Sequence, residues 1–301
     1  MSLRPRILVT GAGGQVGREL LRSFGDSADV FAFDHAALDL ASPDQIRAKV
    51  RETQPQVIIN AGAYTAVDRA ESEPDLAMAI NALAPGVLAE EASRLNALLV
   101  HYSTDYVFDG SKAGPWIETD PTNPLSAYGA TKLAGEDAIR QVGGRYFIFR
   151  TSWVYGPHGK NFLLTMLRLG RERDTLNVVD DQIGAPTTSI ELARATRAII
   201  SGILADRCGS AGEWAGVYHM TCSGAVSWCG FAKAIFARAP ELLNGRTPKV
   251  NAIPTSEFPT PAARPRNSVL SNEKLHDRLG VQLAPWESAL DEVLRALATP
   301  Q

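Results

Sequence analysis

Short apolar runs recur along the first half of the chain and are separated by stretches of amphipathic helical pattern. Each run is four or five residues long and rich in β-branched, leucine or aromatic side chains, which is typical of strands buried on both faces. The predicted strands are Ile7–Thr10, Val30–Phe33, Val57–Asn60, Leu98–Tyr102 and Tyr146–Phe149. The alternation of strands with helices predicts an α/β fold built on a Rossmann-type, doubly wound parallel sheet.

The regular alternation stops near residue 155. Helices are predicted over residues 161–170 and from Ser189, and residues 217–220 are expected to return to the sheet. Two proline-rich stretches, residues 253–255 and 258–266, are predicted as loops of the kind that form lids or binding walls. We expect a dinucleotide-binding domain of residues 1–153 plus about 183–221, and a smaller substrate-binding domain of residues 154–182 and 222–301.

Composition narrows the class of protein. The net charge of -3 and the lack of a basic run interleaved with aromatic residues argue against a nucleic-acid partner. No apolar run approaches the roughly 18 residues that span a bilayer, and no signal peptide precedes the first strand, so no membrane association is expected. Cys208, Cys222 and Cys229 fit no metal spacing with the five histidines, which favours reduced cysteines in a cytoplasmic protein.

A glycine-rich turn follows the first predicted strand. Gly11, Gly14 and Gly17 have the spacing that permits a tight turn, close approach to a pyrophosphate and close packing of the next helix. Asp34 ends the second strand, about twenty residues downstream, where an acid binds the ribose hydroxyls of NAD. A cap for a turn is the alternative role of Asp34, and the nearby Arg18 and His35 leave the choice between NAD and NADP open.

Further candidate residues follow the carboxyl ends of predicted strands, where open α/β sheets bind their ligands. Small residues at positions 61–63 would let the backbone approach a cofactor. Asp39 and Leu40 suit either a contact with adenine or a simple turn. The hydroxyls of residues 103 and 104 suit either caps or hydrogen bonds to a ligand, and the glycine turn favours the second interpretation.

Tyr128 and Lys132 are spaced by four residues in a stretch that favours helix, so they share one helix face. An ammonium beside a phenol stabilises the phenolate and lowers its pKa, which would let Tyr128 act as an acid or base near neutral pH. Taken alone, the pair is more often an ordinary surface contact.

Several longer motifs strengthen the interpretation. Tyr128-x-x-x-Lys132 and the glycine turn occur in the order and at the intervals seen in extended short-chain dehydrogenase/reductases. The segments 101–108, 149–155, 181–187 and 254–265 closely resemble the dTDP-4-dehydrorhamnose reductase family, and the resemblance runs from Ile7 to about Trp286.

This resemblance implies an NADPH- or NADH-dependent enzyme that reduces the C4 carbonyl of dTDP-6-deoxy-L-lyxo-4-hexulose, the last step of dTDP-L-rhamnose synthesis. Tyr128 would donate the proton, Lys132 would hold the nicotinamide ribose, and Thr104 would bond the carbonyl oxygen. The implied cofactor-binding residues are Gly11, Gly13, Gly14, Gln15, Val16, Gly17, Asp34, Asp39, Leu40, Ala61, Gly62, Ala63, Tyr128 and Lys132. The implied residues of the substrate pocket are Thr65, Asp68, Thr104, Asp105, Trp153 and Arg264, with Arg264 on the diphosphate.

Some family members form dimers that bind Mg²⁺ through interface carboxylates. Glu19 matches one such position, but the neighbourhood of Glu191 does not align cleanly with the second. A homodimer is therefore possible for this chain, and no metal site is predicted.

Reduction of another nucleotide sugar is one alternative to the implied reaction, and three other functions compete with reduction itself. A dehydratase would carry a glutamate after Asp105, where this chain has Tyr106, and an epimerase would retain tightly bound NAD. The regulatory subunit of methionine adenosyltransferase resembles the same family without acting as a catalyst. Intact Thr104, Tyr128 and Lys132 argue against that third function.

Overall fold

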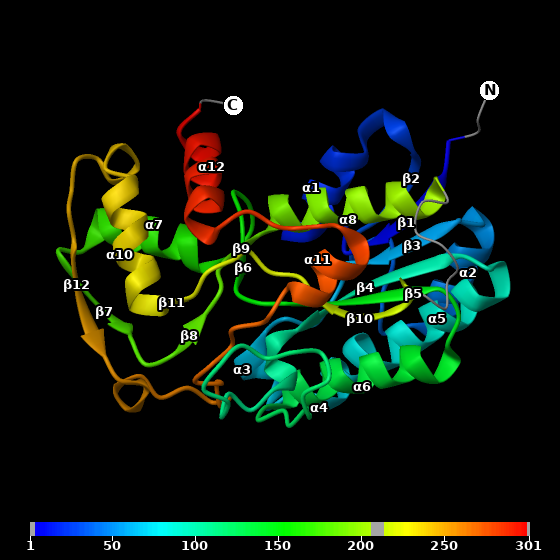
Figure 1. Ribbon diagram of the computed structural model, residues 1–301, viewed down its shortest axis with the longest axis horizontal. Coiled ribbons are helices and arrows are strands. Elements are labelled where there is room, and N and C mark those ends of the chain that lie inside the picture. Colours follow the sequence, from blue (N-terminus) through cyan, green and yellow to red (C-terminus); the bar gives the residue numbers. More distant parts are fainter. Residues whose placement is uncertain (1–3, 206–213, 300–301) are drawn as a thin grey trace.

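A parallel sheet forms the centre of the molecule in the computed structural model, which describes residues 4–205 and 214–299 (Figure 1). Its strands lie in the order β10, β5, β4, β3, β1, β2, and every neighbouring pair is parallel. Their bounds are β1 Arg6–Thr10, β2 Asp29–Phe33, β3 Val57–Asn60, β4 Leu98–Thr104, β5 Tyr146–Thr151 and β10 Gly216–His219. The five strands predicted from the first half of the chain, and the return of residues 217–220 to the sheet, are confirmed.

Helices cover both faces of this sheet, which confirms the doubly wound fold (Figure 1). One face carries α1 (Gln15–Phe24), α8 (Ser189–Leu204) and α11 (Glu273–Leu279), and its core is apolar. The opposite face carries α2 (Pro43–Thr53), α5 (Ala84–Leu95) and α6 (Ala127–Val142). The chain reverses its direction across the sheet at β1, because β2 lies on one side of β1 and β3 on the other. Ligands of such sheets bind at this reversal, beyond the carboxyl ends of the strands.

The helical segment of residues 74–95 is divided into three parts. These are α4 (Pro74–Met78), a π-helical turn η2 (Ala79–Leu83) and α5. Pro85 has no N–H to donate to the carbonyl of Asn81, which explains a change of hydrogen-bond pattern at this point. The short helical segments elsewhere are η1 Gly25–Ser27, α3 Val67–Ala70, η3 Asp105–Val107, η4 Glu241–Leu243 and η5 Thr255–Glu257.

A smaller lobe packs beside the carboxyl edge of the sheet and has its own apolar core. Its helices are α7 (Phe162–Glu172), α10 (Trp228–Arg238) and α12 (Trp286–Ala298). Its short strands pair as β7 (Thr175–Val179) with β12 (Lys249–Ile253), β6 (Val154–Tyr155) with β9 (Thr187–Thr188), and β8 (Ile183–Gly184) with β11 (Val226–Ser227). The expectation that residues 253–255 lie wholly in a loop is wrong for Ile253, which ends β12 and pairs with Val179.

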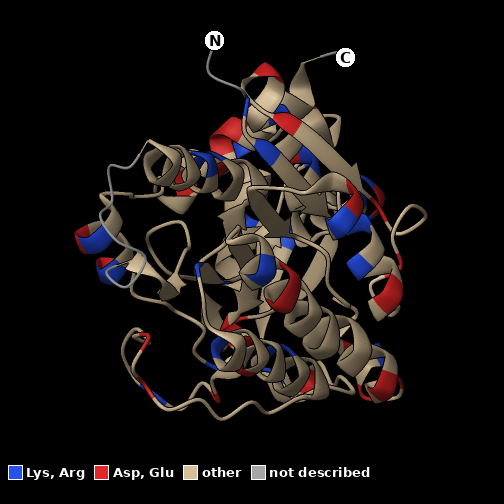
Figure 2. Cartoon of the chain, turned by 90° about the vertical axis from the view of Figure 1, so that its right-hand side faces the viewer, with Lys and Arg blue, Asp and Glu red and all other residues tan. Residues whose placement is uncertain are grey.

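The surface charge is mixed in sign, and the helices are moderate in hydropathy. Figure 2 shows acidic and basic segments interspersed over the helices turned toward the viewer. Within residues 4–205 and 214–299, no helix has the length and apolar character needed to cross a membrane. Cys222 and Cys229 are buried thiols in the smaller lobe, and Cys208 lies outside the described residues.

Candidate active site

The glycine turn after β1 forms a cradle of backbone. Gly11 has a φ of +65°, and a Cβ on Gly17 would collide with the Gly11 carbonyl oxygen, so α1 packs directly against the turn. The Gly14 N–H donates to Gly11 O over 2.9 Å, and Gly14 precedes the first turn of α1. Gly62, beyond β3, lies against Gly11 at the point where the strand order reverses. This close approach leaves exposed backbone at a helix N-terminus, an arrangement that fits a pyrophosphate.

The acids expected near adenosine also cap turns. Asp34 Oδ1 accepts from the backbone N–H groups of Ala36 at 3.1 Å and Ala37 at 3.0 Å, and Asp39 Oδ1 accepts from Ala41 at 2.9 Å. Asp34 is exposed and adjoins Gly13, so the turn contact leaves it next to the cradle.

Other predicted residues line the same edge of the sheet. Leu40 is buried and lies against Gly62, while Gln15 accepts from Asn161 Nδ2 at 2.9 Å and so joins the cradle to the smaller lobe. The structure therefore brings the predicted cofactor residues together around the carboxyl ends of β1, β2 and β3.

Helix α6 presents Tyr128 and Lys132 at the carboxyl end of β4. Ser126 caps the helix by accepting from the Gly129 N–H at 3.2 Å, and the two residues share one face as predicted. The amino group of Lys132 is buried beneath the helix. It donates to Tyr102 O at 2.6 Å and contacts His101 Nε2 at 3.1 Å.

The pKa of Tyr128 differs from the expectation drawn from sequence. Burial raises the pKa of the Tyr128 phenol to about 12, a hydrogen bond with Thr104 opposes this rise, and the Asp105 carboxylate adds to it. Lys132 is turned toward the sheet, and burial lowers its own pKa to about 7, against the pull of Glu136. The predicted lowering of the Tyr128 pKa by Lys132 is therefore wrong, because burial of the phenol raises its pKa while the Lys132 ammonium points to the sheet.

Thr104 lies beside Tyr128 and bonds a buried carboxyl group. Its Oγ1 donates to Asp105 Oδ1 at 2.9 Å and accepts from the Tyr106 N–H at 3.2 Å, and its hydroxyl is close enough to the Tyr128 phenol to lower that phenol's pKa. Burial raises the pKa of Asp105 to about 6, although hydrogen bonds from Ser268 and Thr104 lower it. Two hydroxyls and a carboxyl group with a pKa close to neutral thus meet at one point, an arrangement suited to proton transfer at a carbonyl.

A buried ion pair fixes α6 to the sheet. Arg150 donates to both carboxylate oxygens of Glu136, with Nε–Oε1 at 2.9 Å and Nη2–Oε2 at 2.7 Å, and Ser103 donates to Oε1 at 2.6 Å. Glu136 lies one helical turn beyond Lys132 and is fully buried. The face of α6 that carries Tyr128 and Lys132 is therefore held at a fixed height above β4 and β5.

The predicted pocket residues Asp68 and Arg264 bind each other. Arg264 donates from Nη1 and Nη2 to the two Asp68 oxygens, at 3.0 and 2.9 Å, and the Ala262 N–H donates to the same carboxylate. The hydrogen bonds from Arg264 lower the pKa of Asp68. This pair ties the proline-rich loop to α3, near the exposed Thr65. A guanidinium that forms paired bonds with a carboxylate can do the same with a diphosphate.

Two indole rings stack on the side of the smaller lobe. The rings of Trp153 and Trp228 are 3.4 Å apart between centroids and nearly parallel, at 7°. Trp153 has a φ of 49°, and Gly184 lies so close to its ring that a Cβ there would collide with it. The motif around Gly184 therefore provides room for an indole that is only partly buried.

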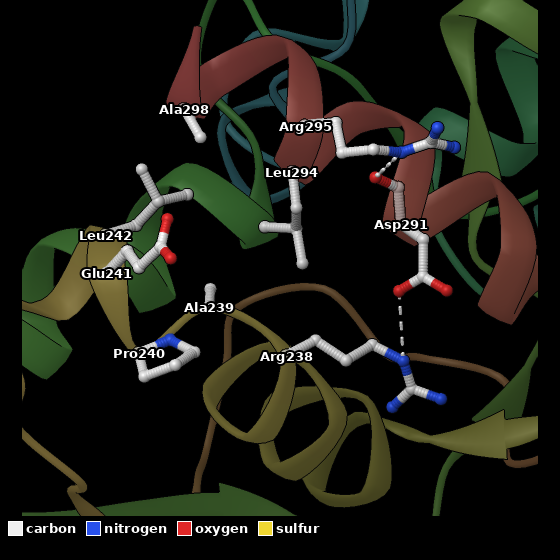
Figure 3. Close-up of a pocket in the computed structure, with 9 residues that line it drawn as sticks. All are labelled: Arg238, Ala239, Pro240, Glu241, Leu242, Asp291, Leu294, Arg295 and Ala298. Atoms are coloured by element: carbon white, nitrogen blue, oxygen red, sulfur yellow. Dashed lines mark hydrogen bonds and ion pairs between the residues drawn. The ribbon is translucent and has the colours of Figure 1, made fainter.

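A separate hollow of about 370 Å³ lies on the outside of the smaller lobe (Figure 3). It is lined by α10, η4 and α12, and Arg238 and Asp291 form an ion pair of 3.2 Å across it. It contains none of the residues predicted for catalysis, which lie at the carboxyl edge of the sheet.

The carboxylates considered for a metal are paired with arginines. Glu19 Oε1 is 3.3 Å from Arg22 Nη1, and Glu191 accepts from Arg194 and from the Ala284 N–H. Within residues 4–205 and 214–299, no group of three or more histidine, cysteine or acidic side chains is arranged to hold a metal ion.

The fold and the site define a Rossmann-type enzyme of the extended short-chain dehydrogenase/reductase class. The family described as RmlD substrate binding domain matches residues 5–299. The chain is 48% identical to a dTDP-4-dehydrorhamnose reductase of Burkholderia thailandensis over 296 residues, covering 97% of this chain and 99% of that protein. It therefore belongs to the dTDP-4-dehydrorhamnose reductase family, as the resemblance predicted.

Solved structures agree with this assignment. A dTDP-4-dehydrorhamnose reductase from Clostridium acetobutylicum has a TM-score of 0.90 and 40% identity, covering 98% of this chain and 100% of that chain. A second, from Bacillus anthracis in complex with NADP, has a TM-score of 0.88 and 36% identity, with coverage of 98% and 100%.

The sequence did not lead to a prediction of the buried residues that hold Lys132 and α6 against the sheet. His101, Asn60, Glu136 and Arg150 are polar residues within apolar strand or helix patterns, and each is buried. Their presence in those patterns was the only available signal, because no local spacing joins them. Trp228 was missed for the same reason, since it meets Trp153 from a helix 75 positions away in the sequence.

Proposed function

We propose that the chain reduces the C4 carbonyl of dTDP-6-deoxy-L-lyxo-4-hexulose to give dTDP-L-rhamnose, with NADPH or NADH as the reductant. The observation that carries the proposal is the placement of the Thr104 and Tyr128 hydroxyls side by side, with Lys132 one helical turn away, at the sheet edge that also holds the glycine cradle. Family membership supports the same reaction, because relatives that are 40% and 48% identical over 97% of this chain are dTDP-4-dehydrorhamnose reductases.

The chain's own residues have separate tasks in this reaction. Thr104 and Tyr128 bond the carbonyl oxygen and stabilise the negative charge that develops on it. Tyr128 then transfers its phenolic proton to that oxygen, which completes the new hydroxyl group. Because burial raises the pKa of Tyr128, the residue is protonated at neutral pH before the transfer. The resulting phenolate requires a nearby cation, and Lys132, one helical turn away, supplies it when protonated.

The cradle fits a nicotinamide dinucleotide, which supplies the hydride when bound. Residues 11–17 would hold its pyrophosphate, Asp34 its adenosine ribose, and Lys132 its nicotinamide ribose. Arg18 donates from Nε to Gly13 O at 3.0 Å and stands beside the same turn. A cation there suits the additional phosphate of NADPH, whereas Asp34 suits NADH, so both cofactors are proposed.

The nucleotide sugar would lie between the sheet edge and the C-terminal loops. Arg264 would exchange Asp68 for the diphosphate, and Thr65, Asp105 and Trp153 would contact the sugar. The half-buried Asp68–Arg264 pair supports this assignment, because its guanidinium is ordered in a paired geometry that also matches phosphate oxygens. A homodimer, a cytoplasmic location and the division into two domains stay predictions.

The decisive experiment follows reduced-nicotinamide absorbance when the protein meets enzymatically prepared dTDP-6-deoxy-L-lyxo-4-hexulose, with NADPH and NADH in separate reactions. Turnover that forms dTDP-L-rhamnose is expected. Folded protein that binds the cofactor but shows no turnover would reject the proposed reaction. Copurification with a methionine adenosyltransferase would then support the regulatory-subunit alternative.

A further inference from the structure

A row of buried polar side chains crosses the sheet on the face covered by α5 and α6. Thr10, Asn60 and His101 stand opposite one another, since the parallel register pairs Thr10 with Asn60 and Asn60 with His101. Each of the three is 1% exposed. The residues two positions earlier in the same strands belong to the apolar core of this face: Leu8, Ile58 and Leu99. The polar row of Thr10, Asn60 and His101 therefore interrupts an apolar layer and requires its own hydrogen-bond partners.

The polar row leads to Lys132 without a break. Thr10 Oγ1 lies 2.7 Å from Asn60 Oδ1, Asn60 Nδ2 lies 3.0 Å from His101 Nδ1, and His101 Nε2 lies 3.1 Å from Lys132 Nζ. At its other end, Thr10 Oγ1 accepts from the Gly62 N–H at 3.4 Å. One chain of hydrogen bonds thus joins the cofactor cradle to the lysine of the candidate active site.

The proton on His101 can take two positions that match two states of Lys132. Burial and the nearby Lys132 hold the pKa of His101 well below its usual range, so the imidazole is neutral, with one donor and one acceptor nitrogen. Beside an ammonium, Nε2 accepts and the Nδ1–H donates to the oxygen of the Asn60 amide. Beside a neutral amine, the Nε2–H donates to Nζ and Nδ1 accepts from the amide nitrogen. A half-turn of the Asn60 side-chain amide exchanges its oxygen and nitrogen and so converts one arrangement into the other.

We propose that His101 is a positioning residue that holds the Lys132 amino group in place and, by changing its tautomer, keeps that group hydrogen-bonded in both protonation states. The importance given to Lys132 rests on the proposed function. Glu136, one turn further along α6, is the charged group that raises the pKa of Lys132, and Tyr128, one turn earlier on the same helix, is itself influenced by Asp105. Within residues 4–205 and 214–299, Nζ bonds His101 Nε2 and the Tyr102 carbonyl, and of these two partners the imidazole alone can either donate or accept a hydrogen bond.

The first test needs neither substrate nor cofactor, so its result is independent of the proposed reaction. The tautomer of His101 is followed by nitrogen NMR of histidine-labelled wild-type protein between about pH 5.5 and 9, with His101→Gln used to assign the signal. The Nδ1–H form is expected at low pH and the Nε2–H form at high pH, with a midpoint at the titration of Lys132. A single tautomer over the whole range would overturn the proposal.

The second test compares the pH profiles of kcat for His101→Leu and His101→Gln. Leucine offers no acceptor to the ammonium, so the alkaline limb, set by loss of the Lys132 proton, should move down by about one pH unit. Glutamine can accept or donate at the same place, so its limb should stay within about 0.3 units of wild type. His276→Gln, at an exposed position in the middle of α11, is the matched control.

Two outcomes of the second test would overturn the proposal. One is a folded leucine variant whose alkaline limb coincides with that of wild type, even if its kcat is reduced. The other is a glutamine variant whose limb shifts as far as that of the leucine variant. If His101→Leu does not fold, the tautomer titration and the glutamine profile still decide the question. Absence of turnover in the wild type would reject the proposed reaction and leave the tautomer result valid.

Discussion

The candidate site has two walls that are held in different ways. The wall formed by α6 and the sheet depends on the Glu136–Arg150 pair, whose side chains are 0% and 2% exposed. The wall formed by the C-terminal loops depends on the Asp68–Arg264 pair, whose side chains are 41% and 22% exposed. A buried pair cannot lose one partner without leaving a desolvated charge, whereas an exposed pair can exchange its partner for water or a ligand. In the proposed reaction, the first wall would fix the groups predicted to be catalytic and the second wall would admit the substrate.

The largest effect on kcat is expected at Tyr128, the proposed proton donor in the first wall. Tyr128→Phe removes the proton donor, so kcat should fall by roughly 10²- to 10⁴-fold while the dissociation constant of NADPH changes little. Steady-state turnover and cofactor titration would measure both quantities. Tyr146→Phe, at the opposite end of β5, is the matched control and should keep full activity. Equal activity of the two variants would show that another group supplies the proton.

The next effect concerns the support of that wall. Glu136→Gln leaves the Arg150 guanidinium buried without its carboxylate, so the free energy of unfolding should fall by about 3 to 5 kcal/mol. Urea denaturation would measure the loss. Glu172→Gln breaks the exposed Arg168–Glu172 pair, whose N–O distance is 3.0 Å, and should cost less than about 1 kcal/mol. Similar losses in both variants would contradict the distinction between buried and exposed pairs.

A pH dependence should arise from Asp105. Because burial raises its pKa from 3.8 to about 6, the folded state binds a proton that the unfolded state has lost between these values. The contribution of Asp105 to stability is therefore lost as pH rises from about 4 to 6. Asp105→Asn removes this loss, so its free energy of unfolding relative to wild type should improve by about 2 to 3 kcal/mol between pH 4 and 7.

Asp109→Asn is the control for the Asp105 measurement. Hydrogen bonds from Ser111 lower the pKa of Asp109, so its contribution is present at neutral pH and lost as pH falls. As pH rises from about 4 to 7, the free energy of unfolding relative to wild type should therefore increase for Asp105→Asn and decrease for Asp109→Asn. Shifts of the same sign would mean that the Asp105 carboxyl group is not destabilised by its burial.

The smallest effect on stability is expected at the second wall. Arg264→Gln should change the free energy of unfolding by less than about 1 kcal/mol, because the pair is half-exposed. The same substitution should raise KM for the nucleotide sugar by roughly 10-fold or more, since a charge-assisted bond to phosphate is lost, with kcat changed less. Lys160→Gln, on an exposed loop of the smaller lobe, is the control. An unchanged KM for Arg264→Gln would remove this residue from the diphosphate site.

The loop at residues 254–266 belongs to the second wall, and we expect it to close over the bound sugar. Limited proteolysis of this loop should slow when a dTDP-sugar is bound, because ordering the loop protects its backbone. Cleavage at the same rate with and without the nucleotide sugar would contradict closure.

Local rules of chain geometry account for what could be predicted from the sequence. Five strands, the glycine turn and the shared face of Tyr128 and Lys132 depend on spacings of a few residues, which strand and helix periodicity fix directly. The prediction that Ile253 lies in a loop was wrong because β12 exists only through its pairing with β7, more than 70 residues earlier. A short strand without a strong local pattern is decided by its partner.

Local patterns in the sequence were sufficient to predict the fold class, the position of the cofactor turn and the catalytic candidates. The partners of those groups emerged only from the folded chain: His101 for Lys132, Thr104 for Tyr128, and Asp68 for Arg264. The physical reason is that hydrogen bonds and desolvation act over distances of a few ångströms in space, between residues that the chain separates by tens of positions. Helical spacing placed Lys132 beside Tyr128, but burial and the polar row determined the direction of its amino group.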